Sequence, residues 1–211
     1  MAPVAGVPFL SHLLRQVSNA GFSQLVLCLG HGHEQIEDWV TSEADPRLHI
    51  EFSVEGEPLG TAGAIALAVR RYPVNRGFFV MNGDSILQVD FAAMSNFHTA
   101  HGKTGTVALA CVPDTSRYGS VELDRSDNIV SFREKSSFPQ SGYINGGIYA
   151  FEPEVLERIE QQSAVSLERT VLPALCPANL AGFKTNGYFL DIGTPHDFQR
   201  AQTEFRELKW L

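Results

Sequence analysis

Short apolar runs alternate with amphipathic segments along the chain. In residues 8–20, apolar side chains recur at helical spacing, which predicts a helix that stops at Gly21. The following run, 24–29, is almost continuously apolar and predicts a parallel strand buried on both faces. Helices and strands that alternate in this way are typical of an α/β protein.

The same criteria predict the remaining elements. Strands are expected over residues 48–54, 77–81, 106–112, 143–151 and 188–192. Helices are expected over 33–40, 61–71, 90–101, 154–161, 166–175 and from 194 onward, with Thr61, Asp90 and Thr194 as N-caps. Residues 118–123 and 129–133 flank a polar turn and predict a β-hairpin. Since no long linker interrupts the series, residues 1–211 are predicted to form a single domain.

Composition narrows the function. The 211 residues carry 16 Lys and Arg against 24 Asp and Glu, a net charge of −8, which argues against a nucleic-acid partner. A small anionic ligand remains compatible with that charge, because a metal ion and local cations can balance it. The three cysteines predict buried free thiols in a reducing compartment. With neither an apolar signal segment nor a membrane-length apolar run, we expect a cytoplasmic protein.

Two apolar strands are each expected to end at a carboxylate. Residues 80–84 read VMNGD and residues 189–194 read FLDIGT, which places Asp84 and Asp191 after strands. Ligands of open α/β sheets bind outside the carboxyl ends of strands, and Mg²⁺ takes one or two protein carboxylates with substrate phosphates. A Mg²⁺–phosphate site built from both residues is therefore a hypothesis. The alternative is a pair of ordinary turn or capping aspartates.

Three further motifs combine polar residues with glycines or a neighbouring charge. In EPLGTAG (57–63), glycines allow a flat ligand to approach, and Glu57 can accept two N–H donors from guanine but one from uracil. In the pair Glu134–Lys135, the carboxylate could bind sugar hydroxyls and the lysine cation could bind a phosphate. In YINGG (143–147), Asn145 can donate and accept beside backbone N–H groups. The respective alternatives are a loop-to-helix junction, an exposed ion pair and a β-bulge.

Taken in order, these motifs resemble those of the sugar-1-phosphate nucleotidyltransferase family. The resemblance extends over nearly the whole chain and rests on seven segments: MAPVAGVP (1–8), EPLGTAG (57–63), NGD (82–84), RYGSV (117–121), FREK (132–135), YINGGIY (143–149) and LDIGTP (190–195). Within the family, the run SRYGSVEL and the segment VSLER (165–169) are most similar to D-glycero-D-manno-heptose 1-phosphate guanylyltransferases.

The resemblance implies a fold, a reaction and a set of roles. The fold would be Rossmann-like, a mixed and mostly parallel sheet flanked by helices with a small β-hairpin insertion. The reaction would join a nucleoside triphosphate, GTP in this subfamily, to a sugar 1-phosphate and release pyrophosphate, for cell-surface polysaccharide or glycan precursors. The implied residues are Asp84 and Asp191 for Mg²⁺, Lys135 for the sugar phosphate, Glu57, Gly60, Thr61, Asn82 and Gly83 for the nucleotide, and Tyr118, Gly119, Glu134, Asn145 and Gly146 for the sugar.

The sequence also departs from the family at its start. Family members begin with a strand and a loop of the form Gly-Gly-x-Gly-Thr-Arg-Leu, followed by a Lys-Pro pair, whereas this chain starts at the residue after that pair. Preorganised donors of this kind are worth roughly 10²–10³ each in rate. The chain as printed is therefore expected to be inactive. Two explanations are carried: a native start upstream of Met1, or a truncated paralogue.

Three functions are thus carried forward. The first is a Mg²⁺-dependent guanylyltransferase acting on a heptose 1-phosphate. The second is a uridylyltransferase for another sugar 1-phosphate, such as N-acetylmuramate 1-phosphate. The third is a non-catalytic binding paralogue. The expected partners are a nucleoside triphosphate and a sugar 1-phosphate, with neither nucleic acid nor membrane, and a homo-oligomer is compatible with the sequence.

Overall fold

A computed structural model describes residues 1–133, 138–161, 166–208 and 210. The chain divides into two compact units. Unit 1 comprises residues 1–73 and 190–211, and unit 2 comprises the continuous segment 74–189. The expectation of a single domain stays a prediction, since a division by contacts does not test whether the units fold separately.

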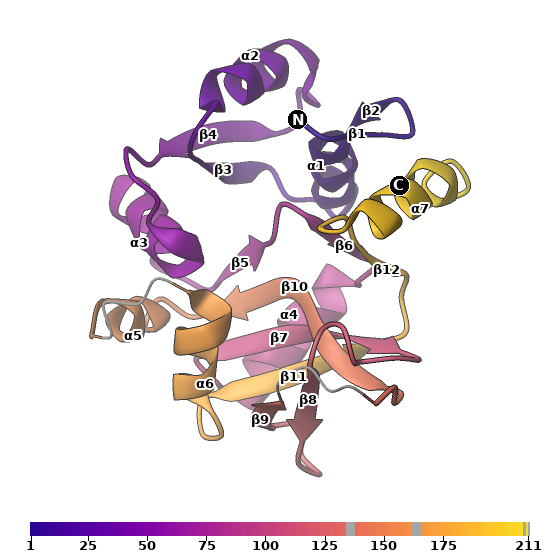
Figure 1. Cartoon of the computed structure of the whole chain (residues 1–211). Coiled ribbons are helices and arrows are strands. Elements are labelled where there is room, and N and C mark those ends of the chain that lie inside the picture. The colour runs from indigo at the N-terminus through magenta and orange to yellow at the C-terminus, as the bar shows by residue number, and fades with distance from the viewer. Residues whose placement is uncertain (134–137, 162–165, 209, 211) are drawn as a thin grey trace. The chain divides into compact units, whose positions relative to one another are not determined.

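Unit 1 is an α/β assembly built around two parallel strands. Its elements are β1 (Pro3–Val4), β2 (Val7–Pro8), α1 (Phe9–Asn19), β3 (Gln24–Leu29), α2 (His33–Glu43), β4 (His49–Val54), α3 (Gly60–Arg71) and α7 (Pro195–Glu204). β3 and β4 pair in parallel from Gln24 opposite His49 to Leu29 opposite Val54, and α3 packs on both strands (Figure 1). The side chains of β3 alternate between exposed and half-buried, so the prediction of a strand buried on both faces is wrong.

The helix α7 is tied to the first strands of unit 1. The Gln202 side chain donates to the Pro3 carbonyl at 2.7 Å and accepts the Ala5 N–H at 3.1 Å. Ala5 and Gly6 form the turn between β1 and β2, both with positive φ (51° and 93°), the geometry of a type I′ hairpin turn. The Gln202 clamp therefore joins residues 199 positions apart in the sequence.

Unit 2 is centred on a mixed four-stranded sheet. Its elements are β5 (Phe78–Met81), β6 (Ser85–Leu87), α4 (Phe91–His101), β7 (Gly105–Val112), β8 (Ser120–Leu123), β9 (Ile129–Arg133), β10 (Gly142–Phe151), α5 (Val155–Gln161), the π-helical turn η1 (Leu167–Val171), α6 (Leu172–Leu175) and β11 (Leu180–Thr185). The strand order is β11-β7-β10-β5, with β11 parallel to β7 and β10 antiparallel to both neighbours. Three strands thus point one way and β10 the other. β12 (Phe189–Asp191) carries the chain back to unit 1.

The core of unit 2 lies where α4 covers this sheet. α4 contacts β7, β10 and β11 (Figure 1), and β7 is buried along Gly105–Ala110. The predicted hairpin is present as β8 and β9, and the predicted cap is present because Asp90 Oδ1 accepts the Ala93 N–H at 2.9 Å. The α/β fold class with a mixed sheet and a hairpin is confirmed.

The cysteines differ from their prediction in burial. All three are free thiols, but Cys28 and Cys111 are exposed and Cys176 is half-buried. Cys111 lies on β7 at the first residue beyond its buried stretch, which explains why an apolar flank misled the prediction. In the described part of the chain, no helix has the length and apolar character to cross a bilayer.

Candidate functional site

The turn after β5 carries the first group of predicted residues. Asn82, Gly83 and Asp84 connect β5 to β6, and the Asp84 carboxylate is exposed. The Asn82 N–H donates to the Gly147 carbonyl at 2.8 Å, which joins this turn to β10. The sequence NGD is therefore positioned by a backbone contact with the neighbouring strand.

A bulge in β10 carries the second group. The register against β7 shifts between Asn145 and Tyr149, as the alternative reading of this motif anticipated. Gly147 has φ of 74° and donates its N–H to Asn145 Oδ1 at 2.9 Å. A Cβ on Gly146 would collide with the Leu87 side chain and the Ala108 carbonyl, so this position requires glycine. The structure thus joins Asn82 and Asn145 by hydrogen bonds to Gly147, the residue next to Gly146.

The hydroxyl of Tyr149 lies beside these two asparagines. Asn145 Nδ2 donates to it at 3.0 Å, and the side chains of Asn82 and Glu168 are its other polar neighbours. Burial of the fully enclosed ring raises the pKa of Tyr149 far above its usual value, and the Glu168 carboxylate raises the pKa further, while the two amides oppose the shift. We call Asn82, Asn145, Tyr149 and Glu168 the Tyr149 network.

Sequence reasoning missed two members of this network. Tyr149 and Glu168 both stand in segments that carry the family resemblance, YINGGIY and VSLER, yet neither received a role. A tyrosine in an apolar strand predicts a core residue, and no local pattern pairs it with a glutamate that lies 19 positions further along the chain. The signal that could have found them is a strand tyrosine beside a glycine pair, since a buried hydroxyl needs polar partners.

Tyr118 and Gly119 lie in a different turn of unit 2, just before β8. Both of their N–H groups donate to the Thr115 carbonyl at 3.0 Å, and Gly119 has φ of 79°. The Tyr118 ring packs edge-on against Phe189 with centroids 5.6 Å apart, and the Arg117 guanidinium lies 5.3 Å from its centre. Glu134 and Lys135, the remaining predicted residues of this unit, lie outside the described residues.

Glu57, Gly60 and Thr61 lie where β4 leads into α3 in unit 1. Glu57 is exposed, and Gly60 is the first helical residue, with φ of 69°. The prediction that Thr61 caps this helix is wrong, because the helix begins one residue earlier with Leu59 at the cap position. The Glu55 carboxylate accepts the Leu59 N–H at 3.1 Å and so satisfies a donor at this end of the helix.

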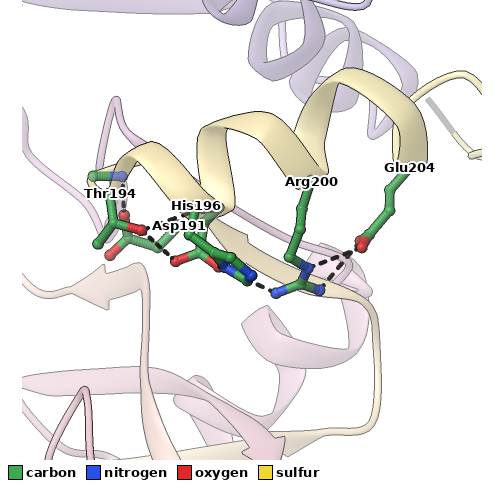
Figure 2. A network of polar contacts seen from close by, with 7 residues as sticks. Asp191, Thr194, His196, Arg200 and Glu204 are labelled. Carbon is green, nitrogen blue, oxygen red and sulfur yellow. Dashed lines mark hydrogen bonds and ion pairs between the residues drawn. The ribbon is translucent and has the colours of Figure 1, made fainter.

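Asp191 lies at the start of a polar network in unit 1, shown in Figure 2. Its Oδ1 accepts the Gly193 N–H at 2.6 Å, which orients the half-exposed carboxylate. Thr194 caps α7 as predicted: its hydroxyl accepts the Asp197 N–H at 3.2 Å and donates to Asp197 Oδ2 at 2.9 Å. Arg200 then bridges the fully buried Asp197 and Glu204 (Figure 2).

The two predicted metal-binding carboxylates come from different units, Asp84 from unit 2 and Asp191 from unit 1. Within the described ranges, no three His, Cys, Asp or Glu side chains gather into a complete metal cage. Mg²⁺ needs no such cage, because it is commonly held by one or two carboxylates, water and substrate phosphates. Asp84 is exposed and Asp191 is half-exposed and oriented by Gly193, so each carboxylate taken by itself is accessible to an ion. The metal site that combines them stays a prediction.

Comparison with known proteins gives the family. The nucleotidyl transferase family model matches residues 1–207. The chain belongs to this family. The α/β architecture agrees, since the structure of HddC from Yersinia pseudotuberculosis complexed with GMP-PN superposes with a TM-score of 0.85 at 28% identity, over 97% of this chain and 88% of that one.

Characterised relatives of this nucleotidyl transferase chain carry two substrate names. Mannose-1-phosphate guanylyltransferase of Mycobacterium tuberculosis is 36% identical over 207 residues, which cover 97% of this chain and 57% of that protein. The mannose-1-phosphate guanylyltransferase catalytic subunit beta of Drosophila pseudoobscura pseudoobscura is 41% identical over 198 residues, which cover 92% of this chain and 53% of that protein. D-glycero-alpha-D-manno-heptose 1-phosphate guanylyltransferase of Aneurinibacillus thermoaerophilus is 32% identical over 98% of this chain and 88% of that protein. The chain therefore spans about half the length of the mannose-1-phosphate relatives.

Proposed function

We propose that this protein is a sugar-1-phosphate guanylyltransferase, which joins GTP to a sugar 1-phosphate and releases pyrophosphate. The carrying observation is the similarity to the Aneurinibacillus heptose 1-phosphate guanylyltransferase, which extends over nearly the full length of both chains. The mannose-1-phosphate relatives are guanylyltransferases too, so the two groups agree on the base. Among the three functions carried from the sequence, the guanylyltransferase has this added support.

The reaction is a single displacement at phosphorus. An oxygen of the sugar 1-phosphate attacks the α-phosphorus of GTP, the bond to the bridging oxygen of the β-phosphate breaks, and pyrophosphate leaves with that electron pair. Positioning and charge neutralisation supply most of the catalysis in such transfers. Bound Mg²⁺ would neutralise phosphate charge, with Asp84 and Asp191 as its protein ligands.

The chain's own residues would hold the two substrates. Glu57 would accept two N–H donors of guanine, while the helix start at Gly60 would let the base approach the backbone. Asn145 would face the sugar hydroxyls with its position fixed by Gly147 and Tyr149. Lys135 would contact the sugar phosphate, and Tyr118 would border the sugar from the turn before β8.

The sugar is proposed to have the manno configuration. The two relative groups act, by name, on mannose 1-phosphate and on a manno-heptose 1-phosphate, and these sugars differ in an additional carbon rather than in the ring. We keep the heptose as the first candidate because the segments SRYGSVEL and VSLER (165–169) are most similar to those of the heptose enzymes. A pocket that accepts an added CH₂OH-sized group distinguishes these substrates by roughly 10–200-fold.

The test is a pyrophosphate-release assay on full-length protein purified from its own cells. GTP, UTP, CTP and dTTP are offered in turn with mannose 1-phosphate and with D-glycero-D-manno-heptose 1-phosphate, each with and without Mg²⁺. We expect release with GTP and Mg²⁺, and higher kcat/KM with the heptose substrate. Preferential release with UTP would make the protein a uridylyltransferase. Ligand binding by calorimetry without release from any pair would make it a binding protein and overturn the proposal.

A further inference from the structure

The Tyr149 hydroxyl is an enclosed polar group beside Asn145 of the predicted sugar site. The residue is 0% exposed, and its hydroxyl has one proton to donate and two lone pairs to accept with. Its three polar neighbours match that inventory. The Asn145 amide donates to it at 3.0 Å. The Asn82 amide beside it can serve as the second donor, and the Glu168 carboxylate, which can only accept when ionised, can take the proton.

The two amides beside this hydroxyl belong to the two segments that carry predicted site residues. Asn145 reaches back with Oδ1 to the Gly147 N–H at 2.9 Å, and the Gly147 carbonyl accepts the Asn82 N–H at 2.8 Å. The bulge of β10 and the turn after β5 are thereby joined by two hydrogen bonds, and the Tyr149 hydroxyl beside both amides would close them into a circuit. Asp84 is two residues from Asn82, at the exposed end of that turn.

Glu168 determines the direction of this circuit. If the Tyr149 proton had no carboxylate to point to, it would have to turn toward one of the two amides, which then could no longer donate to the hydroxyl. A 180° flip of the Asn145 amide would restore that bond, but it would place NH₂ against the Gly147 N–H and break the 2.9 Å contact. A buried polar network that is half satisfied in this way is costly, so the arrangement depends on Glu168.

The Glu168 side chain is itself held in place by a short helical segment. Ser166 caps the π-helical turn η1, where its hydroxyl accepts the Arg169 N–H at 3.1 Å and donates to Glu168 Oε2 at 3.2 Å. π-helical turns occur frequently at functional sites. The carboxylate therefore reaches the network from an element other than the two that the network joins.

We propose that Glu168 is a positioning residue for nucleotidyl transfer: through the Tyr149 hydroxyl it orients Asn82 and Asn145, and so fixes both the Asp84 turn and the sugar-facing bulge. This inference rests on the proposed function for its effect on rate. The arrangement of the network itself is independent of any activity.

The kinetic test compares the full-length parent protein with four variants and one control variant. Glu168→Ala removes the acceptor and is expected to lower kcat about ten-fold. Glu168→Gln keeps a carbonyl acceptor and is expected to stay within about two-fold of the parent. The double variant Tyr149→Phe/Glu168→Ala should be no slower than Tyr149→Phe alone, because Glu168 acts through that hydroxyl. Glu160→Ala, on the exposed surface of α5, is the matched control and is expected to leave kcat unchanged.

A second readout follows the network without turnover. In ¹⁵N-labelled protein, the side-chain amide signals of Asn82 and Asn145 should shift in Glu168→Ala and keep their parent positions in Glu168→Gln and Glu160→Ala. Unmoved amide signals in Glu168→Ala, or rate effects that multiply in the double variant, would overturn the proposal. If the parent protein releases no pyrophosphate, the proposed function fails while the amide signals still decide whether Glu168 orients the network. Thermal unfolding of each variant separates a local change from loss of the fold.

Discussion

At the scale of single residues, Gly147 is a position of the predicted sugar site that a larger side chain would not fit. Its φ of 74° favours glycine, and a Cβ there would lie 2.6 Å from Ser85 Oγ and 3.2 Å from the Asn82 side chain. The same residue both accepts from Asn82 and donates to Asn145. Both the backbone conformation and the close packing therefore require glycine at position 147, where the turn after β5 meets the bulge of β10.

We expect Gly147→Ala to lower the free energy of unfolding by about 1–3 kcal/mol, because it adds strain and a collision in a packed region. It should also lower the rate of transfer more than its stability loss explains, since the Asn82 and Asn145 contacts must shift. Urea unfolding followed by the pyrophosphate assay measures both. Gly56→Ala is the control, because nothing lies within 4 Å of its Cβ position, and it should change stability by less than about 0.5 kcal/mol. Equal effects of the two substitutions would contradict the assignment.

Polar and glycine residues that end or interrupt apolar strands were predictable from sequence, and residues that support them from the core were not. Asn82, Asn145 and Gly146 stand out as polar or glycine positions against apolar strands. Tyr149 and Glu168 do not, because a buried tyrosine in a strand and a glutamate in a helical segment are each ordinary on their own. Their relation exists only once β10 and η1 are packed in three dimensions.

At the scale of elements, α7 shows a helix start whose sequence signal and structure agree. Thr194 and Asp197 bond reciprocally, Pro195 occupies the first turn, and the buried Asp197 also pairs with Arg200 at 3.2 Å. Thr-Pro-x-Asp is a strong local signal because every group involved lies within one helical turn. The weaker signal at Thr61 failed for the complementary reason, since Glu55 supplies an acceptor from outside the helix.

Removing the hydroxyl that caps α7 provides the element-scale prediction. Thr194→Ala is expected to cost about 1–2 kcal/mol, because it leaves one backbone N–H without its acceptor and a buried carboxylate without its hydroxyl partner. Thr203→Ala, on the exposed side of the same helix, is the control and should be neutral or slightly stabilising. Chemical denaturation of both variants decides the matter. A Thr194→Ala protein as stable as the control would show that the cap contributes nothing.

At the scale of the whole molecule, the succession of helices and strands was predictable and the division into two units was not. Local periodicity identifies each element with its approximate limits. It contains no information on which strands pair, so it gave neither the antiparallel course of β10 nor the exposure of β3. The return of residues 190–211 to unit 1 is likewise a long-range feature, without a local signal.

Each unit contains a buried histidine, and we therefore expect the folded protein to be less stable in acid. Burial lowers the pKa of His12 in unit 1, with the Val4 carbonyl opposing and Arg15 adding to the shift. Burial likewise lowers the pKa of His98 in unit 2, where Glu152 opposes it. In the unfolded chain both histidines have a pKa near 6.5, so below that pH they bind protons there while they stay neutral in the folded protein. The free energy of unfolding should therefore fall as the pH drops from 6.5 through the lowered folded values.

Urea unfolding at about pH 7.5 and about pH 5.5 checks this expectation. The loss of stability between the two conditions should shrink in His12→Gln and in His98→Gln, and shrink most in the double variant. His31→Gln, at an exposed position, should retain the full loss. A double variant that loses as much stability as the parent would rule out these histidines as the cause.

The Gln202 clamp has a consequence for how the protein is made. A ribosome delivers residues 74–189 as one uninterrupted stretch, so unit 2 possesses all of its residues before unit 1 does. Unit 1 is synthesised as two separate segments, 1–73 and 190–211. Its hairpin of β1 and β2 can form the contacts with Gln202 only after that residue has been translated, almost 200 positions later. During synthesis, a segment that is made before unit 2 is thus among the last to complete its contacts.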